Sequence, residues 1–333
     1  MEDQYILYFD SGTNNTRLYV LNQEMDIILV NKKSIGSKDS AIAGSNKILI
    51  EGMKELYDKT LKEMKISEKH VKEIFASGMV TSPYGLKEIP HQVLPITINE
   101  FVEAIVPFYE DTSFKREMYL IPGLKTINDD FTYVNNMRGE EIEIFGTLDE
   151  LKTISNSKNV ALILPGSHTH TTYIQDDKII GIISNFSGEL FHALRSSTIL
   201  APILDIDDMK LDKAMVKKGV ENLRNFGFNR AIYISHSMRL FNKGTEVERF
   251  SYAEGVINGG VRESLEYYCE KYWKECDTIA LVADKFMYEL YSTIFDGSDY
   301  IKEIIWLPIS ETNSYAVKGL KKMVSLRGDK YEI

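Results

Sequence analysis

Short apolar runs separated by polar turns fill the first 80 residues of the chain. Residues 5–10, 17–22 and 26–33 each match a strand, and the short turns between them predict an antiparallel meander. At 46–64, apolar side chains recur at helical spacing and charged residues occupy the other positions, so we expect an amphipathic helix there. Residues 71–80 then predict a short buried strand.

The same order of elements begins again in the second half. Residues 159–164 form a continuous apolar run, and two further strands at 171–177 and 178–186 are separated by a polar turn. Beyond them the pattern is mainly helical, with late strands at 278–284 and 303–309. The expected helices are 188–204, 208–226, 252–273, 285–295 and 314–324. The sequence therefore predicts an α/β fold of two ribonuclease-H-like domains with an interdomain cleft.

The boundary between the two domains is expected where the apolar pattern is lost. A chain of 333 residues exceeds the size at which a single hydrophobic core keeps growing, so we expect two domains. The segment ELKTISNSKN, at 150–159, lacks apolar periodicity. We therefore predict an N-terminal domain at 1–155 and a C-terminal domain at 156–333.

Charge and hydropathy limit the classes of partner. With 39 Lys and Arg against 49 Asp and Glu, the net charge is −10, which argues against a nucleic-acid partner. No apolar run reaches the roughly 18 to 20 residues of a membrane span. We expect a soluble cytoplasmic protein without a membrane partner. The two cysteines, Cys269 and Cys276, are expected on one helix, two turns apart and too distant for a relaxed disulfide.

Two loops of small residues occupy equivalent places in the two halves. The first, DSGTNNT at 10–16, joins the first two strands, and the second, PGSHTHT at 165–171, follows the strand that opens the second half. Such loops present backbone N–H groups and hydroxyls without bulky side chains, which suits phosphate oxygens. Alone, the first loop is equally typical of a plain hairpin turn. Its repetition favours a clamp for nucleotide phosphates that closes when the domains rotate.

Particular residues are expected to contact the phosphates and the metal. Asp10 ends the leading strand and would repel an anion, so we expect its carboxylate to contact Mg²⁺ or a metal-bound water. The expected phosphate contacts are Gly12, Thr13, Asn14, Asn15, Gly166, Ser167, His168 and Thr169. A metal or Ser-His hydrolase site at His168 and His170 would need further ligands, and no carboxylate or cysteine stands nearby in sequence.

Seven motifs, in order along the chain, resemble one family of kinases. They are DSGTNNTR (10–17), SGMVTSPYGLKEIP (77–90), IPGLKT (121–126), MRGEE (137–141), PGSHTHTT (165–172), SGELF (187–191) and LVADK (281–285). The chain thereby resembles the 2-dehydro-3-deoxygalactonokinase family, also called 2-keto-3-deoxygalactonate kinases, of the actin, hexokinase and heat-shock ATPase superfamily. The resemblance implies that ATP, with Mg²⁺, phosphorylates the 6-hydroxyl of the small-molecule sugar acid 2-keto-3-deoxygalactonate.

The chain departs from the family pattern at both nucleotide segments. His170 replaces a basic residue that is common in the second loop, so phosphate contact there would rest on backbone and hydroxyl groups. Ala283 stands where glycine is common, in the segment that the resemblance assigns to adenosine.

The MRGEE motif offers a catalytic base for such a reaction. A hydroxyl nucleophile needs a carboxylate that accepts its proton. Glu140 and Glu141 are expected at the start of a helix, about 100° apart, so at most one should face the substrate. We favour Glu140, with Glu141 and Asp10 as competitors. An acidic first turn that is favoured by the helix dipole explains both glutamates equally simply.

The sugar acid needs a cationic side chain for its carboxylate and a turn of the backbone that lines its binding site. Arg138 could grip its carboxylate in a bidentate contact, or cap a neighbouring carbonyl. Gly78, Met79 and Ser82 could line the sugar site, or only turn the chain. Arg17 is expected to be structural or to form an ion pair at the hinge, because strand alternation turns it away from Thr16.

Two other functions and one mode of assembly stay open from the sequence. A phosphohydrolase of the same superfamily would use a similar glutamate to activate water, and a non-catalytic sugar-acid sensor would keep the clamp without the base. The aromatic stripe Tyr267, Tyr268, Tyr272 and Trp273 suits helix packing or a homodimer interface.

Overall fold

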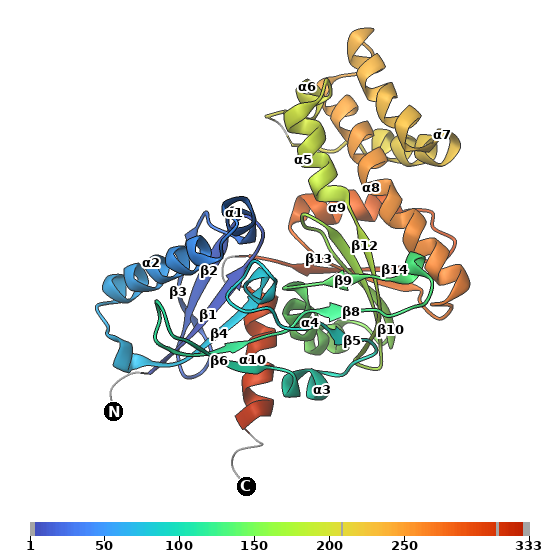
Figure 1. The fold of residues 1–333 in the computed structure, drawn as a ribbon. Helices are drawn as coiled ribbons and strands as arrows, with labels where there is room; N and C mark the ends of the chain where they lie inside the picture. Colours follow the sequence, from blue (N-terminus) through green and yellow to red (C-terminus); the bar gives the residue numbers. More distant parts are fainter. Residues whose placement is uncertain (1–3, 208, 311–312, 329–333) are drawn as a thin grey trace. The chain divides into compact units, whose positions relative to one another are not determined.

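The computed structural model describes residues 4–207, 209–310 and 313–328 of the chain. The chain divides into two compact units (Figure 1). Unit 1 contains residues 1–151 together with 314–333, and unit 2 contains residues 152–313. Each unit is built around one central sheet, and each is described below by itself.

The sheet of unit 1 begins with the predicted meander. Its strand order is β3-β2-β1-β4-β7-β6, with the first three strands antiparallel and β4 parallel to β1. The strands are β1 (Tyr5–Ser11), β2 (Thr16–Leu21), β3 (Ile27–Lys33), β4 (Val71–Gly78), β6 (Val106–Glu110) and β7 (Arg116–Leu120). The three predicted strands and the buried strand after them are confirmed, whereas β6 and β7 were not predicted.

Helices cover both faces of this sheet. The predicted helix at 46–64 is confirmed as α2 (Lys47–Met64), and its buried side, which includes Met53 and Leu56, packs onto Leu7 and Phe9 of β1. On the other face lies α10 (Tyr315–Gly328), where the Arg327 guanidinium stacks 3.5 Å from the ring centroid of Tyr119. Figure 1 shows α10, in red, beside the sheet that begins with the first residues of the chain.

Several small elements complete unit 1. They are α1 (Ser37–Ala43), α3 (Ile98–Glu103), α4 (Glu140–Ile154), the one-turn helices η1 (Glu68–His70), η2 (Met79–Thr81) and η3 (Phe131–Tyr133), and a sheet of three two-residue strands, β5 (Gln92–Val93), β8 (Leu124–Lys125) and β9 (Asn136–Met137). Of these, only the helix that starts at the MRGEE motif was predicted, and α4 confirms it.

The sheet of unit 2 repeats the topology of unit 1. Its order is β12-β11-β10-β13-β14, again three antiparallel strands followed by parallel ones. The strands are β10 (Asn159–Leu164), β11 (Thr169–Gln175), β12 (Lys178–Asn185), β13 (Thr278–Ala283) and β14 (Glu303–Pro308). Because both sheets share this order, the prediction of two ribonuclease-H-like domains is confirmed.

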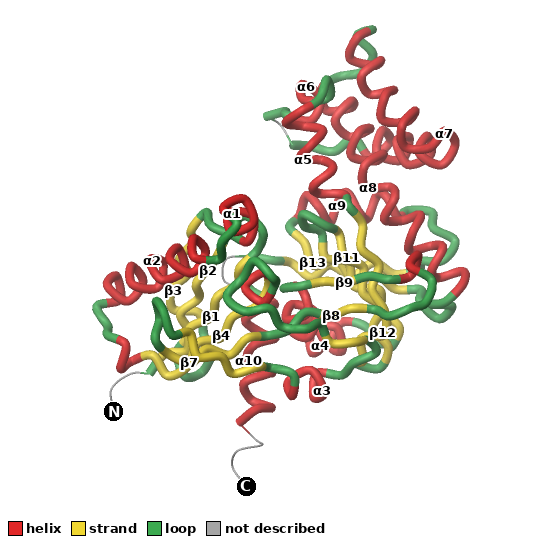
Figure 2. Tube along the Cα trace, viewed as in Figure 1, coloured by secondary structure: helices red, strands yellow, loops and turns green. Residues whose placement is uncertain are grey.

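Helices make up the rest of unit 2 (Figure 2). They are α5 (Ser187–Ser197), α6 (Ala201–Leu204), α7 (Lys213–Leu240), α8 (Glu246–Lys271) and α9 (Lys285–Phe295). Helices α5 to α8 share a small core of their own that includes Leu204, Phe250 and Val256. The predicted helix at 208–226 begins at a residue outside the described ones, and α7 continues past it through a break at Gly227, where φ is 72°.

The last helix belongs to unit 1, which corrects the predicted domain bounds. Residues 314–333 were assigned to the C-terminal domain, but α10 packs backbone to backbone against α4. A Cβ atom added at Gly146 would lie 1.9 Å from the carbonyl oxygen of Tyr315, and one at Gly319 would lie 2.0 Å from that of Ile142. This contact forms only because both helices have glycine there. The division within α4 falls after residue 151, four residues before the predicted boundary.

The two cysteines differ from the prediction. Helix α8 ends at Lys271, and the chain turns back so that Trp273 and Tyr272 both bond to the carbonyl of Tyr268. Both thiols are buried, and the Cys276 thiol donates to the carbonyl of Thr278 at 3.8 Å. The prediction that both cysteines lie on one helix was wrong, and both thiols are free and buried.

The aromatic stripe near the end of α8 is split between core and surface. Trp273 is buried against Tyr173, and Tyr268 packs onto the same core. Tyr267 and Tyr272 are exposed. Half of the stripe is thus helix packing, and the homodimer interface stays a prediction.

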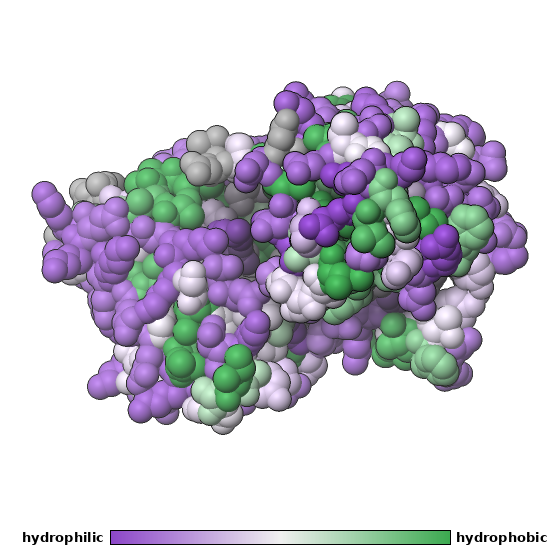
Figure 3. All heavy atoms as spheres, turned by 90° about the horizontal axis from the view of Figure 1, so that it is seen from above, coloured by the Kyte–Doolittle hydropathy of each residue, from purple (hydrophilic) through white to green (hydrophobic). Residues whose placement is uncertain are grey.

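The face shown in Figure 3 is mostly hydrophilic with scattered hydrophobic side chains, and no described helix is long and apolar enough to cross a membrane.

Candidate active site

The first loop is held in shape by the helix that follows β3. The Gly12 N–H donates to the carbonyl of Asn15 at 2.8 Å, which closes the turn, and the Lys38 N–H donates to the carbonyl of Thr13 at 3.0 Å. A Cβ atom at Gly36 would lie 2.2 Å from that same Thr13 oxygen, so only glycine permits this approach. Among the described residues, the amides of Thr13 and Asn14 donate to no protein acceptor.

The second loop is built in the same way within unit 2. A Cβ atom at Gly188, in the first turn of α5, would lie 2.0 Å from the carbonyl oxygen of Gly166. The Glu189 N–H donates to the carbonyl of Ser167 at 2.7 Å. In both units a glycine near the start of the next helix therefore lets the loop carbonyls approach that helix. The predicted equivalence of the two loops is confirmed at the level of their backbone packing.

Asp10 ends β1 and forms an ion pair across the meander. Its Oδ2 accepts from Nη1 of Arg17 at 3.0 Å, and the two residues are direct cross-strand partners. Arg17 therefore has a structural role, and its ion pair joins two neighbouring strands of unit 1 rather than a hinge. On the other side of β1, Asp10 is in register with Ser77 of β4, whose Oγ is 2.7 Å from the Tyr8 hydroxyl.

A tight turn follows β4 directly beside the first loop. Gly78 adopts φ 80°, and a Cβ atom there would lie 2.4 Å from the carbonyl oxygen of Ser11. The Thr81 hydroxyl donates to the carbonyl of Gly78 at 3.0 Å, and the Ser82 hydroxyl donates to that of Met79 at 2.7 Å. The position of a Cβ at Gly139 would be 3.4 Å from the Cα of Gly78. The first loop, this turn and the MRGEE motif therefore meet in one place.

The glutamates of α4 separate into two groups. Glu141 is fully buried, and its Oε2 accepts from the Gly139 N–H at 2.7 Å, so it caps the start of its own helix. Burial and the charge of Glu140 raise the pKa of Glu141 to about 8. This is the structural role that an acidic first turn predicts. Its Oε1 has no hydrogen-bond partner among the described residues.

Glu140 and Glu143 instead lie near Asp10. They are three residues apart and so share one face of α4. Burial raises the pKa of Glu140 to about 7 and that of Glu143 to about 8, and the Asp10 carboxylate adds to both shifts. Glu143 was not among the predicted site residues, although its spacing from Glu140 was a usable signal. Glu140 and Glu143 thus both respond to the charge of Asp10 at the end of β1.

Arg138 is already committed to protein acceptors. Its Nη1 donates to the Thr81 hydroxyl, and its Nη2 donates to the carbonyl of Ile89 at 3.0 Å and to Nδ1 of His91 at 3.1 Å. Burial lowers the pKa of His91 to about 4, with the Arg138 charge contributing, so the ring stays a neutral acceptor. Because both hydrogens of Nη2 are used, the predicted bidentate grip on a substrate carboxylate would require breaking one of these bonds.

The remaining predicted residues lie in unit 2. His170 is buried, its Nδ1 is 3.1 Å from the Ser184 hydroxyl, and burial lowers its pKa to about 4. His168 packs beside the ring of Phe186. Ala283 is buried at the end of β13, where its carbonyl accepts from Nε1 of Trp306 at 2.9 Å. Within the described residues, no group of three or more His, Cys, Asp or Glu is arranged to hold a metal ion.

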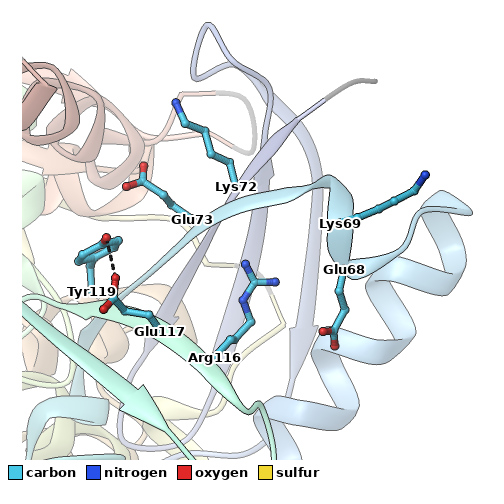
Figure 4. A pocket seen from close by; sticks show the side chains of 7 residues that line it. All are labelled: Glu68, Lys69, Lys72, Glu73, Arg116, Glu117 and Tyr119. Atoms are coloured by element: carbon cyan, nitrogen blue, oxygen red, sulfur yellow. Dashed lines mark hydrogen bonds between the residues drawn. The ribbon is translucent and has the colours of Figure 1, made fainter. Parts of the chain in front are cut away.

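A surface pocket of about 380 Å³ lies elsewhere in unit 1 (Figure 4). Its lining residues are Glu68, Lys69, Lys72, Glu73, Arg116, Glu117 and Tyr119. Lys72 and Glu73 belong to the beginning of β4, whereas Gly78 and the first loop are at its other end. The pocket has equal numbers of acidic and basic side chains, and it contains none of the predicted site residues.

Comparison with known proteins assigns a family to the chain. A family model described as 2-keto-3-deoxy-galactonokinase matches residues 10–320. The chain belongs to the 2-keto-3-deoxy-galactonokinase family. The resemblance inferred from the seven motifs is thereby confirmed.

Two similar proteins carry related descriptions. A protein of Rhizobium meliloti (strain 1021), described as a probable 2-dehydro-3-deoxygalactonokinase, is 24% identical over 197 residues, which are 59% of this chain and 58% of that protein. The match therefore spans less than two thirds of that relative. A crystal structure from Sinorhizobium meliloti with the same provisional description covers 99% of this chain and 100% of its own, with a TM-score of 0.75 and 18% identity. It shares the fold.

Proposed function

We propose that the protein is an ATP-dependent kinase that phosphorylates the 6-hydroxyl of 2-keto-3-deoxygalactonate. Membership of the 2-keto-3-deoxy-galactonokinase family supports the substrate class. The observation that carries the proposal is the position of Glu140, a carboxyl near Asp10 where the first loop, the turn at Gly78 and the MRGEE motif meet. Such a group suits a phosphoryl transfer that needs a base beside a phosphate site.

Glu140 is the proposed general base. As the phosphoryl group leaves ATP for the sugar oxygen, the 6-hydroxyl proton passes to the Glu140 carboxylate, and ADP departs. A pKa of about 7 keeps a large fraction of this carboxyl ionised at neutral pH while leaving it basic enough to accept a proton. Glu141 is unsuited to the role because it is fully buried and bonded to the Gly139 amide.

The two loops are the proposed phosphate sites. In the first, the amides of Thr13 and Asn14 are available donors, with Gly12 and Asn15 closing the turn between them. In the second, the backbone of 166–169 is the proposed contact. Of the departures from the family, the buried neutral His170 is consistent with a site that relies on backbone and hydroxyl donors. Ala283 remains the proposed neighbour of adenosine.

Asp10 fits the metal that such a reaction uses. Mg²⁺ in kinases keeps several waters and takes only one or two carboxylates together with the phosphates, so a cage of three protein ligands is not required. Asp10 supplies a carboxylate at the end of β1, and only its Oδ2 is bonded to Arg17. Bound there, Mg²⁺ would neutralise the charge that develops on the phosphates.

The turn after β4 is the proposed sugar-acid site. Gly78 and Met79 supply backbone close to the first loop, and Ser82 keeps its hydroxyl hydrogen for the carbonyl of Met79. Ser82 can therefore act toward the substrate as an acceptor. Arg138 supplies positive charge and two hydrogens that the described residues leave unused, one on Nη1 and one on Nε, rather than a free two-pronged face.

A coupled ADP-release assay tests this function. Mg·ATP is supplied with 2-keto-3-deoxygalactonate, with its epimer 2-keto-3-deoxygluconate or with no acceptor, and the product is analysed for a 6-phosphate. The proposal requires ADP release that depends on the sugar acid, together with a 6-phosphorylated product. ADP release that ignores the acceptor would indicate a phosphohydrolase. Ligand binding without any turnover would indicate a sugar-acid sensor.

A further inference from the structure

A chain of buried hydrogen bonds runs beneath the second loop of unit 2. Thr169 begins β11 directly after that loop, and its Oγ1 is 2.6 Å from the Ser187 hydroxyl and 3.2 Å from the Tyr291 hydroxyl. The Tyr291 hydroxyl donates to Oδ1 of Asn258 at 3.1 Å, and Nδ2 of Asn258 donates to Oε2 of Glu254 at 2.7 Å. The chain thus connects the second loop to helix α8 through helix α9.

Every member of this chain lies inside the protein. Thr169, Ser187, Asn258 and Glu254 are each no more than 5% exposed, and Tyr291 is fully buried. Apolar side chains that include Leu290 and Ile294 surround Tyr291. Buried polar groups in such surroundings cost stability unless all of them are bonded, and apolar residues of equal size often pack as well. Stability alone therefore gives no reason for five polar residues here.

The orientation of the Asn258 amide sets one direction of donation along the chain. Tyr291 gives its one hydroxyl hydrogen to Asn258, so its oxygen must accept the hydrogen of Thr169, whose own oxygen then accepts from Ser187. All hydrogens then run toward the Glu254 carboxylate, which can only accept. A protonated Glu254 can donate to the Asn258 amide oxygen if the amide turns over and gives up the 3.3 Å bond from its nitrogen to the Glu254 carbonyl. The whole chain then reverses, so that Thr169 donates to Ser187.

Reversal changes what the second loop meets. In the reversed chain the hydrogen of Ser187 is no longer used by Thr169 and is released at the first turn of α5. That turn is packed against the second loop, since the following Gly188 lies against the Gly166 carbonyl and the Glu189 N–H bonds to Ser167. The donor at Ser187 is therefore next to the loop backbone that the proposed function assigns to phosphate.

We propose that Glu254, through Asn258 and Tyr291, is a positioning residue that sets the hydroxyls of Thr169 and Ser187 for nucleotide binding at the second loop. This inference rests on the proposed function, because it takes the loop to bind ATP phosphates. The proposal adds Glu254, Asn258 and Tyr291, which all lie outside the seven motifs, to the residues of the site.

The charge state of Glu254 follows from its surroundings. Burial raises its pKa to about 8, against a lowering influence of the Asn258 hydrogen bond. Within the described residues no charged side chain contributes to this shift, and Tyr291 of α9 is the titratable group coupled to it. Glu254 consequently carries a proton at pH 7, which favours the reversed chain, and loses it as the pH rises through about 8, which favours the direction toward the Glu254 carboxylate.

Direct nucleotide binding provides the test. The dissociation constant of Mg·ADP is measured by calorimetry at pH 7 and pH 9, without a sugar acid, for wild type, Glu254→Gln and Tyr291→Phe. We expect the wild-type constant to rise about fivefold to tenfold between these pH values, the loss that follows from one misdirected hydrogen bond. Gln at 254 keeps its hydrogens at every pH and should abolish this rise. Tyr291→Phe breaks the link between Thr169 and Glu254 and should abolish this rise as well.

Matched variants separate positioning from folding. Tyr300→Phe removes a hydroxyl that packs against the same core, just before the start of β14. This variant should bind Mg·ADP as the wild type does. If Tyr291→Phe fails to fold, Thr169→Ser, which keeps the hydroxyl, should bind more tightly than Thr169→Val. Equal pH dependence in wild type and Glu254→Gln would overturn the proposal, as would equal binding by Thr169→Ser and Thr169→Val.

The proposed function and this inference fail independently. Turnover of the sugar acid by wild type tests the function and involves no variant. The ratio of the Mg·ADP dissociation constants at pH 9 and pH 7 tests the positioning role and involves no sugar acid. If Tyr291 had a merely structural role, Tyr291→Phe would lower the melting temperature but would keep the wild-type ratio of the dissociation constants at pH 9 and pH 7.

Discussion

Replacing Gly146 by alanine is expected to force α4 and α10 apart. The added Cβ would lie 1.9 Å from the carbonyl oxygen of Tyr315 and 2.8 Å from the amide nitrogen of Gly319. Both obstacles are backbone atoms of a helix, so no side chain can rotate away. Contacts below 3.0 Å are essentially never found, and α10 must therefore retreat by at least about 1.1 Å.

The free-energy change follows from two opposing effects. Over-packing of a tight contact costs roughly 1 to 3 kcal/mol, and a backbone obstacle places Gly146→Ala near the upper end. Alanine regains about 1 kcal/mol through its higher helix propensity. We therefore expect a net loss of about 2 kcal/mol in the free energy of unfolding. Because Glu140 begins the same helix, kcat should fall as well.

Urea denaturation of the full chain measures this change. Gly328→Ala, in the last turn of α10, is the matched control because a Cβ there would meet no described atom within 4 Å. It should stabilise the protein by about 0.5 to 1 kcal/mol. The reasoning is refuted if Gly146→Ala stabilises the protein as much as Gly328→Ala does.

Three further predictions concern ionisable groups. The wild-type kcat/KM should fall about tenfold per pH unit below pH 7, because Glu140 must lose its proton to act as base, and a flat profile from pH 5 to 7 would contradict this. The pKa of Glu254 is raised in the folded protein, so the free energy of unfolding of the wild type should decline as the pH rises from about 5 through 8. In urea denaturation, Glu254→Gln should therefore be more stable relative to wild type at pH 9 than at pH 6. Arg138→Lys cannot bond Thr81, Ile89 and His91 together, so we expect this variant to lose about 2 kcal/mol in the free energy of unfolding by urea and to have a higher KM for the sugar acid. A variant as stable as the wild type would show that these bonds are dispensable.

The sequence predicted the repeated parts of the fold well because their patterns are long and regular. Both meanders show strong apolar runs, and the second repeats the first in order, so each prediction supported the other. The two-residue strands β5, β8 and β9 are too short to show any period, and they exist only because distant segments pair. The placement of α10 in unit 1 depends on the contact between Gly146 and Gly319, which no local pattern reveals.

The candidate site was predicted by residue type better than by role. The two glutamates of MRGEE were distinguishable only in three dimensions, where Glu141 turns to the Gly139 amide and Glu140 lies near Asp10. Glu143 could have been included from helical spacing alone. The acceptors of Arg138 come from residues 81–91, about 50 positions earlier, so its lost bidentate face had no signal in the sequence.

The measurement that tests the central claim most directly is turnover by three neighbouring variants. The rate of ADP release from Mg·ATP with 2-keto-3-deoxygalactonate is compared for Glu140→Gln, Glu141→Gln and Glu143→Gln, each checked for folding by its melting temperature. We predict that Glu140→Gln loses at least about a hundredfold in kcat while Glu141→Gln, which keeps an oxygen for the Gly139 amide, loses much less. A Glu140→Gln variant that turns over at the wild-type rate would contradict the assignment of Glu140 as the base.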